Sequence, residues 1–389
     1  MDKGRQSLLS LPAIPLVLAY IAFPLVDMST RAMGRETFRS WIDIAWLLLS
    51  IMAIVHSLLR PNQPLLFPIL PREVLIAAPI VFVLSVLPML GKSFSSVTYA
   101  MEMKPILYIV VAWLWVLVFG FPSKRAFVQA GLCLSALIAA EFVISSVVYQ
   151  TWTRPIGSGE INYDACLIVL SLCVAMADEE TPRFYALLLF AGILATFSRT
   201  GVVVALLIVL VSRRVPRSAK LLAFGAAAVV SVFSFLIRGL ELTVDRIDRY
   251  LMWTSALQLF TASPSGLIWG YGVGTQLPLS SSVPRGLGDL WFSQTDKLGL
   301  SGVYAFEYHA MWLRMTITWG IIVTSLVLIA VIALIFQENS LLRRYLAFVV
   351  LLEGFSMGLI YLSNVGVPLW ILILLASRDL RTPRLWRRT

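Results

Sequence analysis

Long apolar runs separated by short polar connections make up almost the whole chain. Most runs contain about 17 to 23 residues, the length of an α-helix that crosses a hydrocarbon core about 30 Å thick. The runs are continuous, whereas the strands of a membrane β-barrel alternate apolar and polar residues. The sequence therefore predicts an all-α, polytopic membrane bundle.

The composition agrees with a membrane protein. Only 13% of the 389 residues are charged, against roughly 25% in an average soluble domain, and 59% are hydrophobic. We expect about twelve transmembrane helices with both termini on one side, or about ten if the two shortest are half-helices. The expected spans are 8–26, 42–59, 72–90, 105–121, 126–148, 162–177, 184–198, 200–212, 221–238, 312–336, 345–363 and 367–377.

The distribution of lysine and arginine predicts the orientation, because cytoplasmic loops of membrane proteins are enriched in both. The side with fewer basic residues carries 13 of the 31. The other side, which we expect to be cytoplasmic, carries Lys3, Arg5, Arg60, Arg72, Lys124, Arg125, Arg183, Arg213, Arg214, Arg217, Lys220, Arg343, Arg344, Arg378, Arg381, Arg384, Arg387 and Arg388.

The longest polar stretch, residues 239–308, falls between the ninth and tenth expected spans and therefore faces outward. The predicted organisation is a bundle of nine spans in 1–238, a large outer loop with amphipathic helices in 239–308, and spans ten to twelve in 309–377. A basic cytoplasmic tail, 378–389, is expected to bind anionic lipids. We look for the function where the loop meets the membrane.

Motifs of several catalytic classes are absent from the sequence. It has no Gly-x-x-x-x-Gly-Lys-Ser/Thr phosphate loop, no His-Glu-x-x-His and no Cys-x-x-Cys, which disfavours ATP-driven and zinc mechanisms. The cysteines Cys133, Cys166 and Cys173 fall within expected spans and are interpreted as packing residues. We expect no metal site and no cofactor.

His309 is the only histidine expected on the outer side, and it begins the apolar segment 308–320. A helix dipole keeps an imidazole at this end neutral and basic, so His309 is a candidate general base. The alternative interpretation is that His309 is an ordinary polar side chain at the membrane interface, at the end of a helix.

Four arginines are candidate ligands of a phosphate, because a guanidinium offers several donors in a fixed fork. Arg199 lies in a tight turn between two apolar runs, where snorkelling to water is the alternative. Arg246 and Arg249 share a face of an expected interfacial helix whose apolar stripe continues through Trp253, Ala256, Leu257 and Phe260. Arg314 follows His309 by five residues, and an internal ion pair is the alternative for it.

Two further patterns are weaker. Gly270, Gly272 and Gly274 permit tight turns and close approach of a ligand, but ordinary loop structure explains them equally well. The acids Glu141, Asp164 and Glu353 lie within expected spans, which suggests an ion pathway. They are scattered along the chain without a repeat between its two halves.

Taken in order, these segments resemble the bacterial O-antigen ligase and polymerase superfamily of membrane glycosyltransferases. The likeness rests on Phe197-Ser-Arg-Thr-Gly201, on Arg249-x-x-x-Trp253 followed by Pro264 and the glycine run, and on His309 with Gly320. These segments fall within residues 195–325, about a third of the chain. Elsewhere the chain is similar to the family only in hydropathy.

The resemblance implies a GT-C-like, metal-independent, inverting glycosyltransferase on the periplasmic face of the bacterial inner membrane. Its donor would be a glycan linked to undecaprenyl pyrophosphate, and no nucleotide or nucleic acid is implied. Arg199 and Arg249 would bind the pyrophosphate and His309 would activate the acceptor hydroxyl. Arg246 and Arg314 are added from their positions alone.

Several functions remain open. A polymerase of O-antigen, capsule or exopolysaccharide repeat units would use a second lipid-linked repeat unit as acceptor and could work with a chain-length regulator. A ligase would use lipid A core instead, but Ala310 and Val323 differ from the residues typical of ligases, which favours the polymerase. A lipid-linked oligosaccharide flippase or transporter, and a peptidoglycan glycosyltransferase of the shape, elongation and division type, are also compatible with the sequence.

Overall fold

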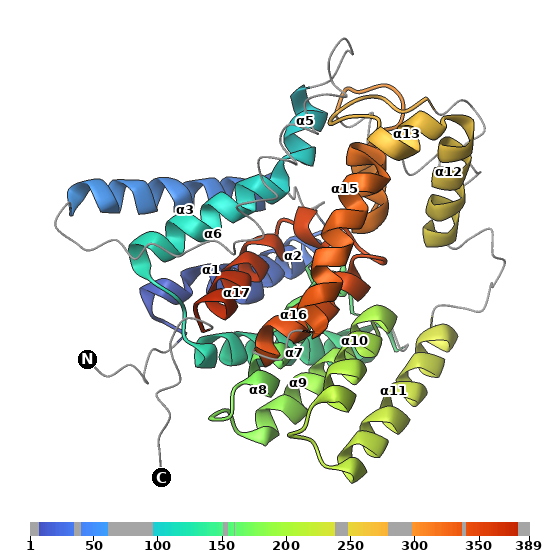
Figure 1. The fold of residues 1–389 in the computed structure, drawn as a ribbon. Coiled ribbons are helices and arrows are strands. Elements are labelled where there is room, and N and C mark those ends of the chain that lie inside the picture. Colours follow the sequence, from blue (N-terminus) through green and yellow to red (C-terminus); the bar gives the residue numbers. More distant parts are fainter. Residues whose placement is uncertain are drawn as a thin grey trace.

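The computed structural model describes residues 8–34, 40–60, 96–150, 155–158, 160–237, 248–278, 298–336 and 340–379. In these residues every extended regular element is a helix, and the one isolated β-bridge joins Gln276 and Tyr304 (Figure 1). The expected all-α class is therefore confirmed for the described part of the chain.

The first helical segment is continuous in space but not uniform. It consists of η1 (Leu11–Ala13), α1 (Ile14–Val17), the π-helical η2 (Leu18–Ala22) and α2 (Phe23–Ala32). Pro15 and Pro24 lack the backbone N–H that a regular α-helix needs, which accounts for the change of helix type.

The remaining helices follow in chain order. They are α3 (Ser40–Leu59), α5 (Ser96–Glu102), α6 (Lys104–Phe119), α7 (Lys124–Tyr149), α8 (Ile161–Ala177), α9 (Arg183–Ala195), α10 (Arg199–Val211), α11 (Arg217–Ile237), α12 (Asp248–Ala262), α13 (Pro264–Trp269), η5 (Ala305–Glu307), α15 (Met311–Phe336), α16 (Leu341–Glu353), η6 (Leu359–Tyr361) and α17 (Gly366–Asp379).

Five segments among the described residues are long and apolar enough to cross a membrane: Leu11–Ala32, Trp41–Leu59, Lys124–Val148, Arg217–Ser234 and Met311–Phe336. The pair α5 and α6, bent by 54°, makes a sixth if it counts as one span. The apolar helices α8, α9, α10 and α17 are shorter. The chain is thus a membrane protein with several spans, and the expected span 72–90 lies outside the described residues.

One expected span is wrong in its extent. Residues 345–363 are not a single helix, because α16 ends at Glu353 and α17 begins only at Gly366. Between them, residues 354–365 contain the short turn η6 and otherwise irregular backbone. The carbonyls of Gly354 and Met357 accept hydrogen bonds from the backbone of Trp312 and Met311, which a continuing helix would have used itself.

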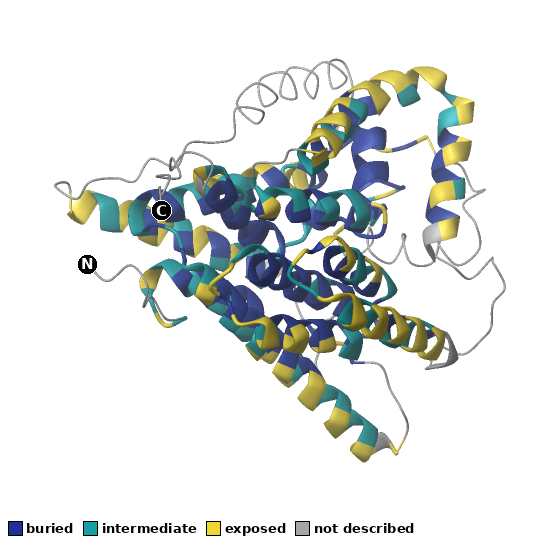
Figure 2. Ribbon diagram, turned by 60° about the horizontal axis from the view of Figure 1, so that its bottom comes forward, coloured by how far each residue is buried: buried dark blue, intermediate teal, exposed yellow. Residues whose placement is uncertain are grey.

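The main core surrounds α8, which is buried along nearly its whole length by α7, α9, α10 and α16 (Figure 2). Two hydroxyl groups form hydrogen bonds between the elements of this core. Tyr20 donates to the carbonyl of Leu167 at 2.9 Å, and Ser171 donates to that of Phe127 at 2.8 Å. An apolar helix that is buried on all sides requires few polar contacts, because its backbone groups already form hydrogen bonds within the helix.

Helices α7 to α10 run alternately between two sets of loops. The first set, which we call the Arg199 end, contains residues 155–158, 160, 196–198 and 354–365. Hydrogen bonds between side chains at this end connect Ser198 with Asn162, Thr200 with Ser356, and Asn364 with Ser158. The second set, which we call the Arg214 end, is joined by the Arg214 guanidinium, which donates to the carbonyls of Ala175, Asp178 and Thr181. Helices α7, α9 and α11 each begin with a basic residue at the Arg214 end.

The expected outer loop is partly packed structure. Apolar residues of α12 and of the segments around it form a second, smaller core: Leu251, Met252, Ala256, Leu259, Tyr271, Leu277, Val303, Ala305, Tyr308, Ala310, Leu313 and Ile317. The expected helix is present as α12 from Asp248 on, and its expected stripe is buried in part: Ala256 is fully buried and Phe260 packs against this core. Trp253 and Leu257 are exposed, because α12 is apolar on both sides and packs through the face of Leu251 and Leu259.

Gly270 and Gly320 allow close backbone contact between the segment around Gly270 and α15. Both have a positive φ, and a Cβ on Gly270 would lie 2.4 Å from the carbonyl oxygen of Thr318, while one on Gly320 would lie 2.1 Å from that of Ile268. The backbone of Tyr271 and Gly272 donates to the carbonyls of Ile317 and Thr318, next to the kink in α15. The glycine pattern seen in the sequence therefore has a structural role in close backbone packing.

Candidate active site

Arg199 follows a turn whose conformation is fixed by several hydrogen bonds. It is the first residue of α10, and the preceding Ser198 caps the helix, accepting from the backbone N–H of Gly201 at 3.4 Å and donating to Asn162 Oδ1 at 2.8 Å. Phe197 has a φ of 52°, which is unusual for a bulky residue. Its carbonyl accepts from Ser234, so the strained turn is held from both sides.

Arginine at the first position of a helix is unfavourable for the helix itself, because the N-terminus already carries partial positive charge. Arg199 is partly exposed at this position. A guanidinium and a helix N-terminus favour the same kind of ligand, an anion such as a phosphate.

His309 lies two residues before Met311, the first residue of α15, on a stretch without regular secondary structure, and it is partly exposed. The first N–H groups of that helix are taken by other backbone: Met311 donates to the carbonyl of Met357 at 3.0 Å and Trp312 to that of Gly354 at 3.2 Å. A Cβ on Gly358 would lie 3.4 Å from the His309 carbonyl oxygen. Residues 354–358 thus lie directly against the segment that carries His309.

The same residues contact the Arg199 turn and α12. The Thr200 and Ser356 hydroxyl groups are 2.8 Å apart. The ring of Phe355 lies between two tryptophans, with centroid distances of 6.2 Å to Trp253 and 6.4 Å to Trp312. Segment 354–358 therefore contacts all three stretches that carry the family resemblance.

The five predicted site residues differ in where they lie and in how much of each the structure describes. Segment 354–358 lies against Thr200, the neighbour of Arg199, and against the backbone carbonyl of His309. Arg249 is the second residue of α12, one turn before Trp253, and the structure describes its backbone only. Arg246 lies outside the described residues.

Arg314 forms an internal ion pair, which was the alternative prediction for this residue. Its Nε lies 3.0 and 3.1 Å from the two carboxylate oxygens of Glu102, and Nη2 donates to the carbonyl of Met101 at 3.0 Å. Its guanidinium carbon is 3.8 Å from the centroid of the Tyr361 ring. Glu102 therefore neutralises Arg314 and links α5 to α15.

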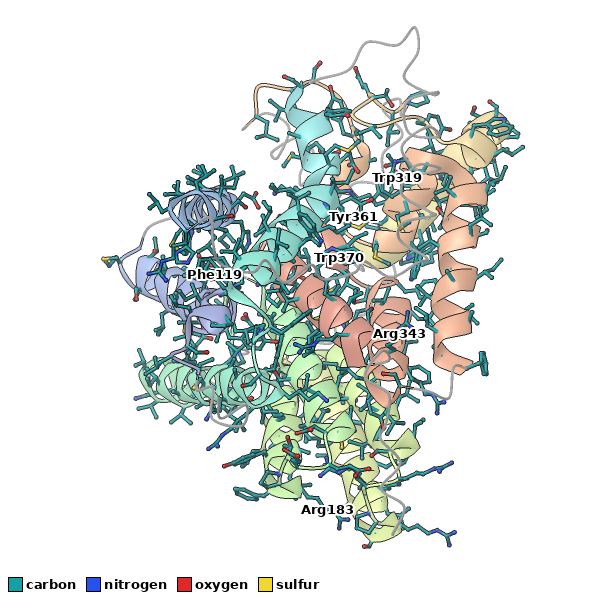
Figure 3. All side chains as sticks on the ribbon, turned by 60° about the vertical axis from the view of Figure 1, so that its left-hand side comes forward. Phe119, Arg183, Trp319, Arg343, Tyr361 and Trp370 are labelled. Carbon is teal, nitrogen blue, oxygen red and sulfur yellow. The ribbon has the colours of Figure 1, made fainter. Side chains whose placement is uncertain are left out.

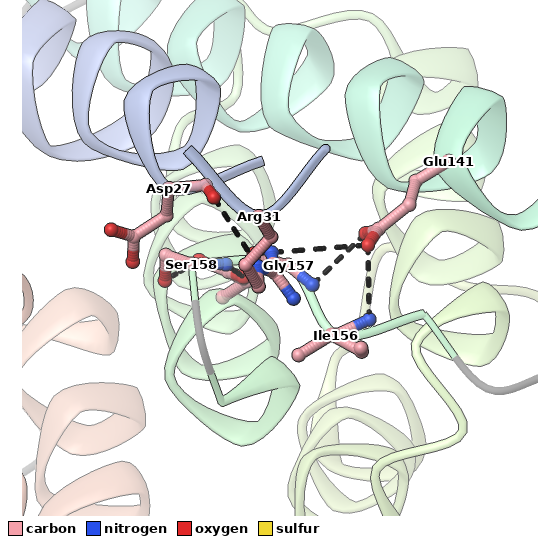
Figure 4. A network of polar contacts seen from close by, with 7 residues as sticks. Asp27, Arg31, Glu141, Ile156, Gly157 and Ser158 are labelled. Atoms are coloured by element: carbon pink, nitrogen blue, oxygen red, sulfur yellow. Dashed lines mark hydrogen bonds and ion pairs between the residues drawn. The ribbon is translucent and has the colours of Figure 1, made fainter. Parts of the chain in front are cut away.

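A second polar network lies at the same end of the bundle (Figure 4). Glu141 accepts from the backbone of Ile156 and Gly157, and it pairs with Arg31 at 3.9 Å. Asp164 accepts from the backbone and the hydroxyl of Ser158, and that hydroxyl in turn accepts from Asn364 at 3.1 Å. Glu141 and Asp164, which are scattered in the sequence, are thus brought together by residues 156–158.

Glu307 is a buried acid only two residues before His309. One of its oxygens accepts from the Tyr304 backbone N–H at 3.1 Å, and the other has no hydrogen-bond partner in the described chain. Burial raises the pKa of this carboxyl to about 8, against the opposing effect of the hydrogen bond from Tyr304. Glu307 can therefore remain protonated near neutral pH.

Glu102, Ser356 and Tyr361 were not predicted as site residues from the sequence. A signal was present for Glu102, an acid between apolar segments, and for the small polar residues of 354–364 that interrupt an apolar run. Neither signal was decisive, because the run is apolar enough to be taken for one span and Glu102 lies in an expected connection.

Comparison of the chain with models of protein families, with curated proteins and with solved structures gives no match. The described residues contain no group of three or more histidine, cysteine, aspartate or glutamate side chains that could hold a metal ion. In the described structure, Thr200, which follows the partly exposed Arg199, and the backbone carbonyl of the partly exposed His309 lie against the same segment, 354–358. This arrangement is suited to proton abstraction beside a bound anion.

Proposed function

We propose that this protein is a membrane glycosyltransferase that moves a glycan from undecaprenyl pyrophosphate to an acceptor sugar hydroxyl. The proposal is supported by one observation above all: segment 354–358 contacts the Arg199 turn, helix α12 and the start of α15. These stretches are far apart in the sequence, and they are the ones that resemble the O-antigen ligase and polymerase superfamily.

The chemistry we assign follows from the residue types. The His309 imidazole removes the proton of the acceptor hydroxyl, whose oxygen attacks the anomeric carbon of the donor. The bond from that carbon to the pyrophosphate oxygen breaks, and the electron pair leaves with the pyrophosphate. Fixed guanidinium groups stabilise this developing charge without reorganising, and a single displacement inverts the anomeric configuration.

We assign the pyrophosphate to Arg199 and Arg249, with Arg246 as a further ligand from the same expected helix face. Arg199 has the helix N-terminus of α10 beside it, which adds to its attraction for an anion. Arg314 is already neutralised by Glu102, so we do not assign the pyrophosphate to it.

Among the family's activities we favour the polymerase of polysaccharide repeat units, because Ala310 and Val323 differ from the residues typical of ligases. The acceptor would then be a second lipid-linked repeat unit, and a chain-length regulator is a candidate partner. We place the protein in the bacterial inner membrane, with the Arg199 end on the periplasmic side.

The first experiment is deletion of the gene in its host, followed by mass spectrometry of undecaprenyl-linked glycans and electrophoresis of the surface polysaccharide. A polymerase predicts that single repeat units accumulate on the carrier or on the core. A ligase predicts long chains that stay on the carrier beside bare core. Unchanged pools would contradict the glycosyltransfer proposal and favour the transporter.

Complementation tests the residues. We expect wild-type protein and His56→Ala to restore the glycan pattern and His309→Ala to fail, although all three insert equally into the membrane. His56 is a matched control because it is the only other histidine and lies near the end of α3. Full complementation by His309→Ala would overturn the assignment of the base.

A further inference from the structure

The hydroxyl groups of Thr200 and Ser356 join two parts of the chain that are 156 positions apart. Their oxygen atoms lie 2.8 Å from one another, and Ser356 is 7% exposed. Thr200 is the second residue of α10 and directly follows Arg199. Two neutral hydroxyl groups provide no charge for an anion. What this bond can contribute is therefore the relative position of the two chain segments that it joins.

The backbone of Ser356 is held by the last turn of α16. Its N–H donates to the carbonyl of Glu353 at 2.9 Å, and the N–H of Met357 donates to the same carbonyl at 2.8 Å. A Cβ on Gly354 would lie 2.6 Å from the indole nitrogen of Trp312, so the chain passes close to α15 where this turn begins. The Ser356 hydroxyl is thus carried by a backbone with little freedom to move.

The same turn is bonded to the beginning of α15. The carbonyl of Met357, the residue after Ser356, accepts from the backbone N–H of Met311 at 3.0 Å. Gly358 follows, and a Cβ on it would lie 3.4 Å from the carbonyl oxygen of His309. The connection from Ser356 to His309 therefore runs through two neighbouring residues and close backbone contacts.

Thr200, on the other side of the bond, belongs to the fixed turn around Arg199. Ser198 precedes Arg199 and caps α10 with its side chain. The backbone dihedrals of a hydrogen-bonded helical turn are fixed together, so a bond at Thr200 also restrains the backbone of Arg199. Arg199 and His309 are therefore connected through two restrained backbones and the Thr200–Ser356 bond between them.

This connection belongs to one end of the bundle. Figure 3 shows Tyr361, three residues beyond Gly358, far from Arg183, the first residue of α9. Arg183 lies at the Arg214 end, whereas segment 354–358 is part of the Arg199 end. The bond between Thr200 and Ser356 is thus located where we place the transfer reaction.

We propose that Ser356 is a positioning residue, which acts through Thr200 to set the distance between the pyrophosphate ligand Arg199 and the base His309. Displacement requires the donor anion and the acceptor hydroxyl to be held in reacting geometry at the same time. A misplacement of about 1 Å can lower the rate of such a reaction about a hundredfold. This inference rests on the proposed function and deepens it, because it names the contact that holds the two halves of the site in register.

The test compares Ser356→Ala with Thr200→Val, which removes the same bond from its other partner and keeps the shape of that side chain. Both variants are purified in nanodiscs and supplied with lipid-linked repeat units extracted from the deletion strain of the host. We expect kcat to fall about tenfold to a hundredfold in each, with the KM for the repeat unit unchanged, since Arg199 and His309 both remain. Thr200→Ser, which keeps the hydroxyl, should retain the kcat of the wild type.

The double variant of Ser356→Ala with Thr200→Val separates positioning from two independent effects. If the bond is what matters, the second substitution removes nothing more, and the double variant has the kcat of either single variant. Losses that multiply would instead refute the positioning role. All rates are measured well below the lowest melting temperature of the set, and if Ser356→Ala does not insert, Thr200→Val and Thr200→Ser decide the question.

Ser171→Ala is the matched control. Ser171 is also a buried serine whose hydroxyl makes a bond of 2.8 Å between two helices, but it lies in the core around α8. Its substitution should lower the melting temperature and leave kcat unchanged. A Ser356→Ala variant with the kcat of the wild type, whether or not its KM is raised, would contradict the proposal.

The two proposals fail in different ways. If the wild-type protein couples repeat units and Ser356→Ala couples them at the same rate, the positioning role is wrong and the proposed function stands. If the wild-type protein does not couple repeat units and the host's glycan pools do not depend on the gene, the proposed function itself is wrong, and the positioning role falls with it.

Discussion

At the scale of single residues, the positions where Gly270 and Gly320 cross leave little room for a larger side chain. Each has a positive φ and lies against backbone atoms, which cannot move aside as the end of a side chain can. We expect Gly270→Ala to destabilise the protein by more than the roughly 1–3 kcal/mol of an unfavourable backbone conformation. Thermal unfolding in detergent would show this as a lower melting temperature.

Gly225 in α11 is the comparison for that substitution. A Cβ there meets no atom within 4 Å, and alanine favours a helix over glycine by about 1 kcal/mol. Gly225→Ala should therefore leave the melting temperature unchanged or raise it. Equal effects of the two substitutions would contradict the close backbone packing at Gly270.

Glu307 makes stability depend on pH. Because burial raises its folded pKa to about 8, above the ordinary carboxyl value, the folded state holds a proton that the unfolded state releases. Its contribution to stability is thus complete below the unfolded pKa and is lost as the pH rises through about 8. We expect the melting temperature to fall between pH 6 and 9 in the wild type by more than it does in Glu307→Gln.

At the scale of elements, the Glu102–Arg314 pair joins two broken helices, the bent α5–α6 pair and the kinked α15. Removing one partner leaves a buried charge, which typically costs about 3–5 kcal/mol. We expect Glu102→Gln and Arg314→Met each to destabilise the protein strongly. The double variant should recover part of the loss, and simple additivity in a double-mutant cycle would argue against direct coupling.

Element positions were largely predictable from the sequence, and their interruptions were not. The start of α7 at Lys124 and the break just before Arg199 follow from apolar runs that end at charged residues. The break after Glu353 was missed because Leu359, Ile360 and Leu362 continue the apolar composition. Hydropathy reports the environment of a segment, whereas this break is set by tertiary hydrogen bonds from α15.

At the scale of the whole molecule, the side of the membrane on which each end of the bundle lies can be measured. Glu180 is exposed at the Arg214 end and Ile156 is exposed at the Arg199 end. In a variant with its native cysteines replaced, a membrane-impermeant maleimide should label Ile156→Cys in intact cells. It should label Glu180→Cys only after lysis, and the reverse pattern would invert the proposed orientation.

The candidate site was predictable only in part at this scale. The sequence pointed to Arg199 and His309, since a cation and an imidazole at membrane boundaries need a reason to be there. It gave no indication that Ser356 and Phe355 join them, because a pattern along the chain contains no information about which loops meet. The Arg314–Glu102 pair likewise depends on a contact between residues more than 200 positions apart.

Segment 354–358 follows the Arg199 turn, α12 and the start of α15 in the order of translation. The Arg199 turn, α12 and the start of α15 are already synthesised when this segment leaves the ribosome, and none of their contacts to it can form before then. Insertion of the earlier helices into the membrane therefore produces a bundle in which these contacts are still missing. A chain stopped after α16 would therefore contain the Arg199 turn, α12 and the start of α15 without the segment that joins them.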